Sequence, residues 1–329
     1  MNPLKKIPVI IDCDPGIDDV MMLLLAFSSE DLDIKLITTE PGNQTQNKTI
    51  YNARAFTSYM KQDIEIARGL DEPFFRVLEV AAEVHGESGL GDVILPEPTL
   101  PESNRTAIDA MKDVLLRSEE EIVLIATGPL TNIGALFLAH PEVKKKIKYI
   151  SYMGGAAIGG NMTPTSEFNV YVDPHAAEIV FRSGVPIVMS GLDVTHKAYI
   201  TLDEIAEIEV TGTELAQNIC SLLKFYIHNT KRTAFHEEHF ERVIRLHDLC
   251  AVSYVITPEL FDGDDCHVEV ELEGRLTAGT TVVDYTQRTG LPQNVKVLHT
   301  VKREEFVQQF FAAIKKMDHY NKGEKRDET

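Results

Sequence analysis

Short apolar runs alternate with longer amphipathic segments up to about residue 200. The runs are continuously apolar, which is typical of strands that are buried on both faces of a parallel sheet. Strands are therefore predicted at residues 7–11, 34–38, 64–67, 122–126, 147–153 and 186–189.

The segments between these runs carry apolar residues at the spacing of one helix face. Repeated alternation of strand and helix indicates an α/β fold with an open, mostly parallel, doubly wound sheet flanked by helices. The predicted helices lie at residues 18–27, 46–60, 106–117, 132–139 and 174–182.

The pattern changes after about residue 200. No linker rich in Pro, Gly or Ser separates the two halves, so the second half is expected to pack onto the sheet. We predict a single domain over residues 1–320 and a charged tail at 321–329 that frays. In the second half, helices are predicted at 213–229, 249–256 and 304–317, and a β segment at 268–272.

Composition is that of a folded protein and limits its partners. Of 329 residues, 43% are hydrophobic and 25% are charged, as in ordinary globular proteins. Lys and Arg total 32 against 51 acidic residues, and the formal charge of −19 would repel nucleic acid and anionic membrane surfaces. A divalent cation or a neutral polar ligand carries no such penalty.

Two further features bear on location. The N-terminus lacks the arrangement of a signal peptide, and no segment has the uninterrupted apolar length of a membrane span. The cysteines at positions 13, 220, 250 and 266 show no paired spacing, so neither a disulfide framework nor a zinc site is expected. A reducing, cytoplasmic location is expected.

Polar residues directly follow the predicted strands. In an open parallel sheet, ligands bind beyond the carboxyl ends of the strands, so these residues are candidates for a site. They include Asp12, Asp14, Asp18 and Asp19 after the first strand, Thr38, Thr39 and Asn43 after the second, Thr127 after the fourth, and Asn161, Glu167 and Asn169 after the fifth.

The four aspartates after the first strand indicate a cation site. Asp12 and Asp14 project to the same side of an extended chain, while Asp18 and Asp19 open the next helix. Carboxylates packed together repel one another, and a hard divalent cation such as calcium or magnesium removes that conflict. Taken singly, Asp18 and Asp19 could only complement the helix dipole, and Asp12 could only cap a turn.

The segment IIDCDPGIDD resembles the signature of the inosine-uridine preferring nucleoside hydrolases. Further segments are similar to that family in the same order, and together they cover the chain from about residue 7 to 257. They are ITTEPGNQT, HGESGLGD, ATGPLTNIGA, MGGAAIGGNMTPTSEFNVYVDPHAA, GLDVTH and RLHDLCAV.

The resemblance implies a calcium-dependent hydrolase that cleaves the N-glycosidic bond of ribonucleosides. It implies that calcium is held by Asp14, Asp19, Asp248 and the backbone carbonyl of Thr127. Asp14 would also be the general base for the attacking water, and the developing oxocarbenium-like ribose would be stabilised by nearby carboxylates. Asp12 is expected to support the site without touching calcium.

The same resemblance assigns the substrate contacts. His247 would be the acid that protonates the departing base, and His85 would sit beside that base. Related enzymes are usually homodimers or homotetramers that serve purine and pyrimidine salvage, and the same is expected here. The contacts implied are Asp18, Asn43 and Asn169 with the 2′- and 3′-hydroxyls, Asn161 and Glu167 with the 5′-hydroxyl, and Phe168 and Met153 as apolar walls.

Residues 225–241 are expected to form a mobile loop or helix over the base. His236 and His239 are three positions apart, whereas the zinc-protease motif needs four, so zinc is not expected. His196 is interpreted as a cap or core histidine. The candidates for base contact in this segment are Tyr226, His228, Phe235, His236 and His239.

Two rival hypotheses remain open at this point. A magnesium-dependent phosphatase of the haloacid dehalogenase type also carries a strand-end DxD, but it would leave Asp18 and Asp19 unexplained. A non-catalytic, calcium-dependent nucleoside-binding protein would use the same ligands without turnover. The presence of Asp14 as a base argues against this second alternative.

Overall fold

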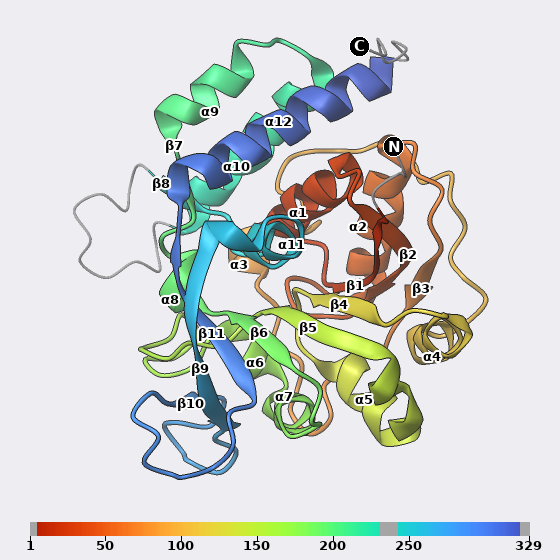
Figure 1. Ribbon diagram of the computed structural model, residues 1–329. Coiled ribbons are helices and arrows are strands. Elements are labelled where there is room, and N and C mark those ends of the chain that lie inside the picture. Colours follow the sequence, from red (N-terminus) through yellow and green to blue (C-terminus); the bar gives the residue numbers. More distant parts are fainter. Residues whose placement is uncertain (1–4, 231–242, 323–329) are drawn as a thin grey trace.

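The computed structural model describes residues 5–230 and 243–322. Across these residues, nine strands form one sheet in the order β10-β9-β11-β6-β5-β4-β1-β2-β3, with helices on both faces (Figure 1). The strands from β11 to β3 are parallel, and β9 is antiparallel to both of its neighbours. The predicted fold, an open and mostly parallel doubly wound sheet, is confirmed.

The strands predicted from apolar runs form the parallel part of the sheet. Two of them have the predicted bounds, and the others begin or end within a few residues of them. They are β1 (Ile7–Cys13), β2 (Leu32–Thr39), β3 (Ile66–Arg68), β4 (Ile122–Ala126), β5 (Ile147–Met153) and β6 (Ile187–Ser190).

The helices predicted between these strands are also present. They are α1 (Ile17–Ser28), α2 (Gln46–Tyr59), α4 (Ala107–Arg117), α5 (Thr131–Ala139) and α7 (Pro174–Phe181). Several shorter helices are not predicted, because elements of one or two turns are too brief to show periodicity. These are α3 (Ala82–His85), α6 (Phe168–Val172), α8 (Leu192–Thr195) and the 3-10 helix η1 (Pro141–Lys146).

The second half packs onto the sheet as predicted, and it also extends the sheet. β9 (Phe261–Val270), β10 (Thr281–Asp284) and β11 (Val295–Val301) continue it beyond β6. Of these strands, only the end of β9 coincides with the β segment predicted at 268–272. β9 begins FDGDD and mixes buried with exposed residues, so it contains no continuous apolar run.

The longer predicted helices of the second half are α10 (Glu214–Thr230), α11 (Leu249–Ile256) and α12 (Arg303–Lys322). α12 is longer than predicted and includes the first two residues of the predicted tail, while residues 323–329 lie outside the described residues. The sequence pattern does not predict α9 (Leu202–Glu209), the 3-10 helix η3 (Pro258–Leu260) or the two-stranded pair of β7 (Tyr199–Thr201) and β8 (Val243–Arg245).

Each face of the sheet has its own core. Val9 and Ile11 of β1 belong to the core shared with α1, α11 and α12, whereas Ile10 belongs to the core shared with α4, α5 and α7. All three side chains are fully buried. Side chains alternate along a strand, so a strand covered on both faces needs an apolar residue at every position. The double covering explains why the parallel strands could be recognised in the sequence.

All four cysteines are buried free thiols, as expected for a chain without a disulfide framework. In residues 5–230 and 243–322, no helix is both long and apolar enough to cross a membrane.

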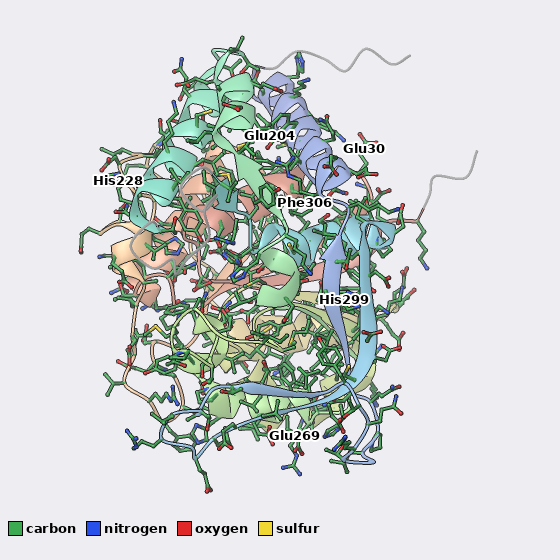
Figure 2. The ribbon with its side chains drawn as sticks, turned by 90° about the vertical axis from the view of Figure 1, so that its left-hand side faces the viewer. Glu30, Glu204, His228, Glu269, His299 and Phe306 are labelled. Atoms are coloured by element: carbon green, nitrogen blue, oxygen red, sulfur yellow. The ribbon has the colours of Figure 1, made fainter. Side chains whose placement is uncertain are left out.

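Phe306 anchors the closing helix α12 in the core. Its side chain, which is labelled in Figure 2, is fully buried. Its ring centroid lies 6.2 Å from that of Phe261. Phe306→Ala is expected to lower the free energy of unfolding by about 3–5 kcal/mol, because it removes buried apolar surface and leaves a cavity. Urea unfolding curves measure this change.

The matched control is Lys315→Ala on the exposed side of α12, which should change the free energy of unfolding by less than about 0.5 kcal/mol. A loss below about 1 kcal/mol in Phe306→Ala would contradict the packing of α12 as part of the core.

Candidate active site

Loops that follow β1, β2, β4 and β5 surround a cavity of about 350 Å³ at the carboxyl edge of the sheet. Most residues predicted for the site line this cavity. They are Asp18, Asn43, His85, Thr127, Met153, Asn161, Glu167, Phe168, Asn169, His247 and Asp248. Asp14 and Asp19 do not line the cavity and are fully buried behind it.

The turn between β1 and α1 positions the aspartates. Gly16 caps the N-terminus of α1, and its N–H donates to Asp19 Oδ2 at 3.0 Å. A Cβ atom at Gly16 would lie 2.5 Å from His85 Nδ1 and 2.8 Å from Asn43 Nδ2, so only glycine allows this close approach. Asp18 and Asp19 therefore open α1, where the helix dipole favours negative charge.

Three carboxylates crowd the floor of the cavity. Oxygens of Asp18, Asp19 and Asp248 lie within 4.8 Å of one another, and these residues are at most 6% exposed. Asp19 accepts hydrogen bonds from Thr127 Oγ1 at 2.9 Å and from Asn43 Nδ2 at 2.8 Å. In contrast, Asp18 Oδ1 and Asp248 Oδ2 are buried without a hydrogen-bond partner among the described residues. Orphaned buried carboxylate oxygens fit a bound cation.

Asp14 lies next to this cluster but is not one of the three. Its Oδ2 accepts a hydrogen bond from the backbone N–H of Asn43 at 2.6 Å, while its Oδ1 is buried without a partner among the described residues. A Cβ atom at Gly128 would lie 2.8 Å from Asp14 Oδ1 and 2.6 Å from Glu40 Oε1. Asp14 and the buried Glu40 thus approach the same backbone segment after β4. In the structure, Asp18 lies in a cluster with Asp19 and Asp248. The ligand set implied by the family resemblance has Asp14 in place of Asp18.

Burial and mutual repulsion raise the pKa values of these carboxyls. Desolvation, followed by the charge of Asp19, raises the pKa of Asp14 well above its usual value and that of Asp18 to about 7. Desolvation, followed by the charges of Asp18 and Asp19, raises the pKa of Asp248 well above its usual value. A divalent cation would displace bound protons and relieve the repulsion.

The loop after β5 supplies a second polar group. Glu167 caps α6 by accepting hydrogen bonds from the backbone N–H groups of Asn169 at 2.9 Å and Val170 at 3.2 Å, and it also accepts one from the N–H of Gly155 at 2.8 Å. The Asn169 amide donates to the carbonyls of Thr127 at 2.8 Å and Met153 at 3.0 Å. The Thr127 carbonyl predicted as a ligand is therefore fixed by Asn169. Desolvation raises the pKa of the Glu167 carboxyl to about 7.

Imidazoles line another part of the cavity. His85 Nδ1 accepts a hydrogen bond from the backbone N–H of Ile17 at 3.1 Å, which places the proton of the neutral ring on Nε2. Desolvation lowers the pKa of His85 to about 3. His247 Nδ1 lies 2.8 Å from Thr195 Oγ1, and desolvation, followed by the charges of His196 and Arg245, lowers the pKa of His247 well below its usual value. The lowered pKa values favour the neutral form of both rings.

His196 is a helix cap, as the sequence interpretation expected, but it also lines the cavity. Its side chain is exposed. Its ring centroid lies 6.0 Å from that of His247. The residue follows β6 through a single helical turn, so the rule that ligands bind beyond strand ends could have identified it.

The segment predicted to lie over the base is only partly described. Tyr226 on α10 lines the cavity, with its ring centroid 5.5 Å from that of His85. His228 is exposed, does not line the cavity and projects outward from α10 (Figure 2). Phe235, His236 and His239 lie outside the described residues. Arg245 on β8 also lines the cavity, and no sequence signal pointed to it.

Comparison with known proteins identifies the class of enzyme. The family described as inosine-uridine preferring nucleoside hydrolase matches residues 9–308. The chain belongs to this family, and it is therefore a nucleoside hydrolase, an enzyme that cleaves N-glycosidic bonds. Membership favours this function over the phosphatase alternative.

Individual relatives cover nearly the whole chain. The pyrimidine-specific ribonucleoside hydrolase RihA of Escherichia coli K12 is 44% identical over 303 residues, which are 92% of this chain and 96% of that protein. The structure of a purine-preferring ribonucleoside hydrolase from Gardnerella vaginalis is 31% identical, with a TM-score of 0.88 over 94% of this chain and 99% of that one. A plant nucleoside hydrolase is 28% identical, with a TM-score of 0.86 over 95% and 99% of the two chains.

The raised carboxyl pKa values predict how stability depends on pH without a cation. The pKa of Asp18 is about 7 in the folded protein and about 4 in the unfolded chain, so the folded state binds more protons between these values. This contribution is present below pH about 4 and is lost as pH rises through about 7. The melting temperature in chelator should therefore fall from pH about 7 to about 8, a range in which His85 is mostly neutral in both states.

Thermal unfolding of the wild type and of Asp18→Asn and Asp248→Asn measures this effect. Both variants should show a smaller fall, and the exposed Asp63→Asn should behave like the wild type. A wild-type melting temperature that is constant or rises over this range would contradict the proposed crowding of charges.

Proposed function

We propose that this enzyme is a calcium-dependent hydrolase that converts ribonucleosides to ribose and free base. The observation that carries the proposal is the set of buried carboxylates with unpartnered oxygens at the floor of a cavity, in a chain of this family. Carboxylate and carbonyl oxygens are the ligands that calcium prefers. Asp14, Asp19, Asp248 and the Thr127 carbonyl would hold it; of these, Asp19 and Asp248 lie in one cluster with Asp18.

Calcium would supply positive charge that orients the ribose hydroxyls and acidifies a water molecule. Asp14 is the proposed general base, because its Oδ1 is buried and has no hydrogen-bond partner among the described residues. Water attacks the anomeric carbon from the side opposite the base, so the product is formed with inversion. The surrounding carboxylates stabilise the positive charge that develops on the ribose.

The remaining cavity residues would bind the two ends of the nucleoside. Asp18, Asn43 and Asn169 are proposed to bind the 2′- and 3′-hydroxyls, since they come from the loops that hold the acidic cluster. Asn161 and Glu167, from the loop after β5, would bind the 5′-hydroxyl.

The base would lie between apolar walls and imidazole donors. Phe168 and Met153 provide apolar surface, while His85 presents its Nε2–H. His247 is the proposed donor to the departing base, and Thr195 holds its ring in place. As a neutral ring, His247 would donate a hydrogen bond from Nε2 when Thr195 donates to Nδ1.

Pyrimidine ribonucleosides are the proposed preferred substrates. The support is the higher identity to the pyrimidine-specific RihA, at 44%, than to the purine-preferring Gardnerella vaginalis enzyme, at 31%. The products are those that base salvage consumes. A homodimer or homotetramer in the cytoplasm stays a prediction, which sedimentation of the purified protein and fractionation of cells test.

The function is tested by incubating the enzyme with uridine and with inosine, with calcium or with chelator, and measuring ribose and free base. We expect release of both products with calcium, faster for uridine, and none with chelator. Asp14→Asn keeps the side-chain shape and the acceptor for the Asn43 N–H, but it should lower kcat by about 100- to 10,000-fold because the base is lost.

Asp63→Asn, an exposed residue, is the matched control and should retain wild-type turnover. Wild-type turnover in Asp14→Asn would refute the assignment of the base. Tight calcium-dependent nucleoside binding without any product would instead support the non-catalytic alternative. Release of phosphate from sugar phosphates without cleavage of nucleosides would support the phosphatase.

A further inference from the structure

The loop that carries His85 is built largely from glycine. Residues 85–91 read HGESGLG, and Gly86, Gly89 and Gly91 have positive φ angles of 79°, 87° and 55°. His85 is the last residue of α3, a helix of four residues, and Gly86 follows it as the C-cap. So short a helix is marginal by itself, and glycine has no side chain that could pack. The direction of the His85 ring therefore depends on supports from other elements.

Hydrogen bonds from amide side chains provide one support. Asn52 of α2 donates to the carbonyls of Pro15 at 3.0 Å and Ser88 at 2.9 Å. Gln44 Nε2 donates to the carbonyl of Gly86 at 3.0 Å. These bonds connect the glycine loop to α2 and to the turn after β1, but they reach only its carbonyl oxygens.

The ring of Phe225 on α10 provides the apolar support. A Cβ atom at Gly91 would lie 2.6 Å from Phe225 Cγ, and one at Gly86 would lie 3.0 Å from Phe225 Cζ. Only glycine allows an aromatic ring to lie this close to the backbone. Gly86 is bonded to His85 in the chain, and the Gly91 N–H donates to the His85 carbonyl at 2.9 Å. The Phe225 ring thus packs on both glycines that hold the His85 backbone.

Phe225 is separated from the substrate site. It is partly buried, packs against the core and is not among the described residues that line the cavity. The next residue, Tyr226, does line the cavity, and its ring centroid lies 5.5 Å from that of His85. Because the Phe225 side chain is apolar and lies behind the cavity wall, any effect that it has on the reaction must pass through the loop that it supports.

We propose that Phe225 is a positioning residue that, by packing on Gly86 and Gly91, sets the direction in which His85 presents its Nε2–H to the base. This inference rests on the proposed function, in which His85 lies beside the base. The Ile17 N–H already occupies His85 Nδ1 at 3.1 Å, so Nε2–H is the one ring donor left, and its direction follows the backbone. Misplacing a substrate-positioning group by about 1 Å can lower a rate by about 100-fold.

The test is a double-mutant cycle between Phe225 and His85, measured as kcat/KM for uridine. His85→Ala should lower kcat/KM by about 100-fold, and Phe225→Ala by about 10-fold, since a misplaced ring retains part of its contact. If Phe225 acts through His85, the double variant should lie within about twofold of His85→Ala alone. Phe225→Leu keeps an apolar side chain over the glycines and should recover part of the loss.

Lys224→Ala is the matched control, because Lys224 precedes Phe225 on α10, is exposed and pairs with Glu209 on the surface. It should leave kcat/KM unchanged, both alone and together with His85→Ala. Thermal unfolding verifies that each variant is folded. If Phe225→Ala does not fold, the smaller truncation Phe225→Val takes its place, and its loss must likewise disappear when His85 is absent.

Losses that multiply to about 1,000-fold in the double variant would overturn the proposal, because they would show that Phe225 acts independently of His85. Wild-type kcat/KM in either single variant would overturn it as well. Failure of the proposed function gives a different result, since the wild type itself would then release no uracil from uridine. A Phe225 loss that disappears in the His85→Ala background supports the proposal.

Discussion

Repulsion among buried carboxyl groups is the constraint on which the rest of this structure depends. Asp14, Asp18, Asp19 and Asp248 are almost completely removed from water at one edge of the sheet. Burial of ionised carboxylates costs free energy, and each charge makes its neighbours harder to ionise. The fold stabilises this arrangement only partly: Asp19 accepts several hydrogen bonds, but oxygens of Asp14, Asp18 and Asp248 have no partner among the described residues. A cation can supply the missing partner for these carboxylate oxygens.

The surrounding fold makes such crowding tolerable by being rigid. Strands covered on both faces hold the loop ends in fixed positions, and Asp12 braces them by accepting from Thr38 Oγ1 at 2.5 Å and Asn132 Nδ2 at 3.0 Å. Asp12 thus connects β1, β2 and the start of α5 below the cavity. Preorganised charge of this kind is the main source of electrostatic catalysis, because nothing has to reorganise when the ribose becomes positive. His85 and His247 line the same cavity as Asp18 and Asp248.

The parallel half of the sheet and most of the cavity lining could be predicted, since both follow from local pattern. Doubly covered strands leave continuous apolar runs, and residues after those strands must meet at one edge. β9 escaped prediction over most of its length because it mixes buried with exposed residues, and β8 because three residues carry no periodic signal. Arg245 lines the cavity from β8, and His196 lines it from the end of α8, which is also too short to be predicted. The position of Asp14 outside the cluster of Asp18, Asp19 and Asp248 could not be predicted either, because the sequence pattern does not give the direction of its side chain.

The most direct measurement is the number of protons released when calcium binds to the metal-free enzyme at pH 7. Titration calorimetry in buffers with different ionisation enthalpies gives this number. Burial and the neighbouring charges raise the pKa of Asp18 to about 7 and that of Asp248 well above its usual value, so net proton release on calcium binding is predicted, and it should decrease in Asp248→Asn. Calcium binding without proton release, or no calcium binding at all, would contradict the view that crowded buried carboxyls form the cation site.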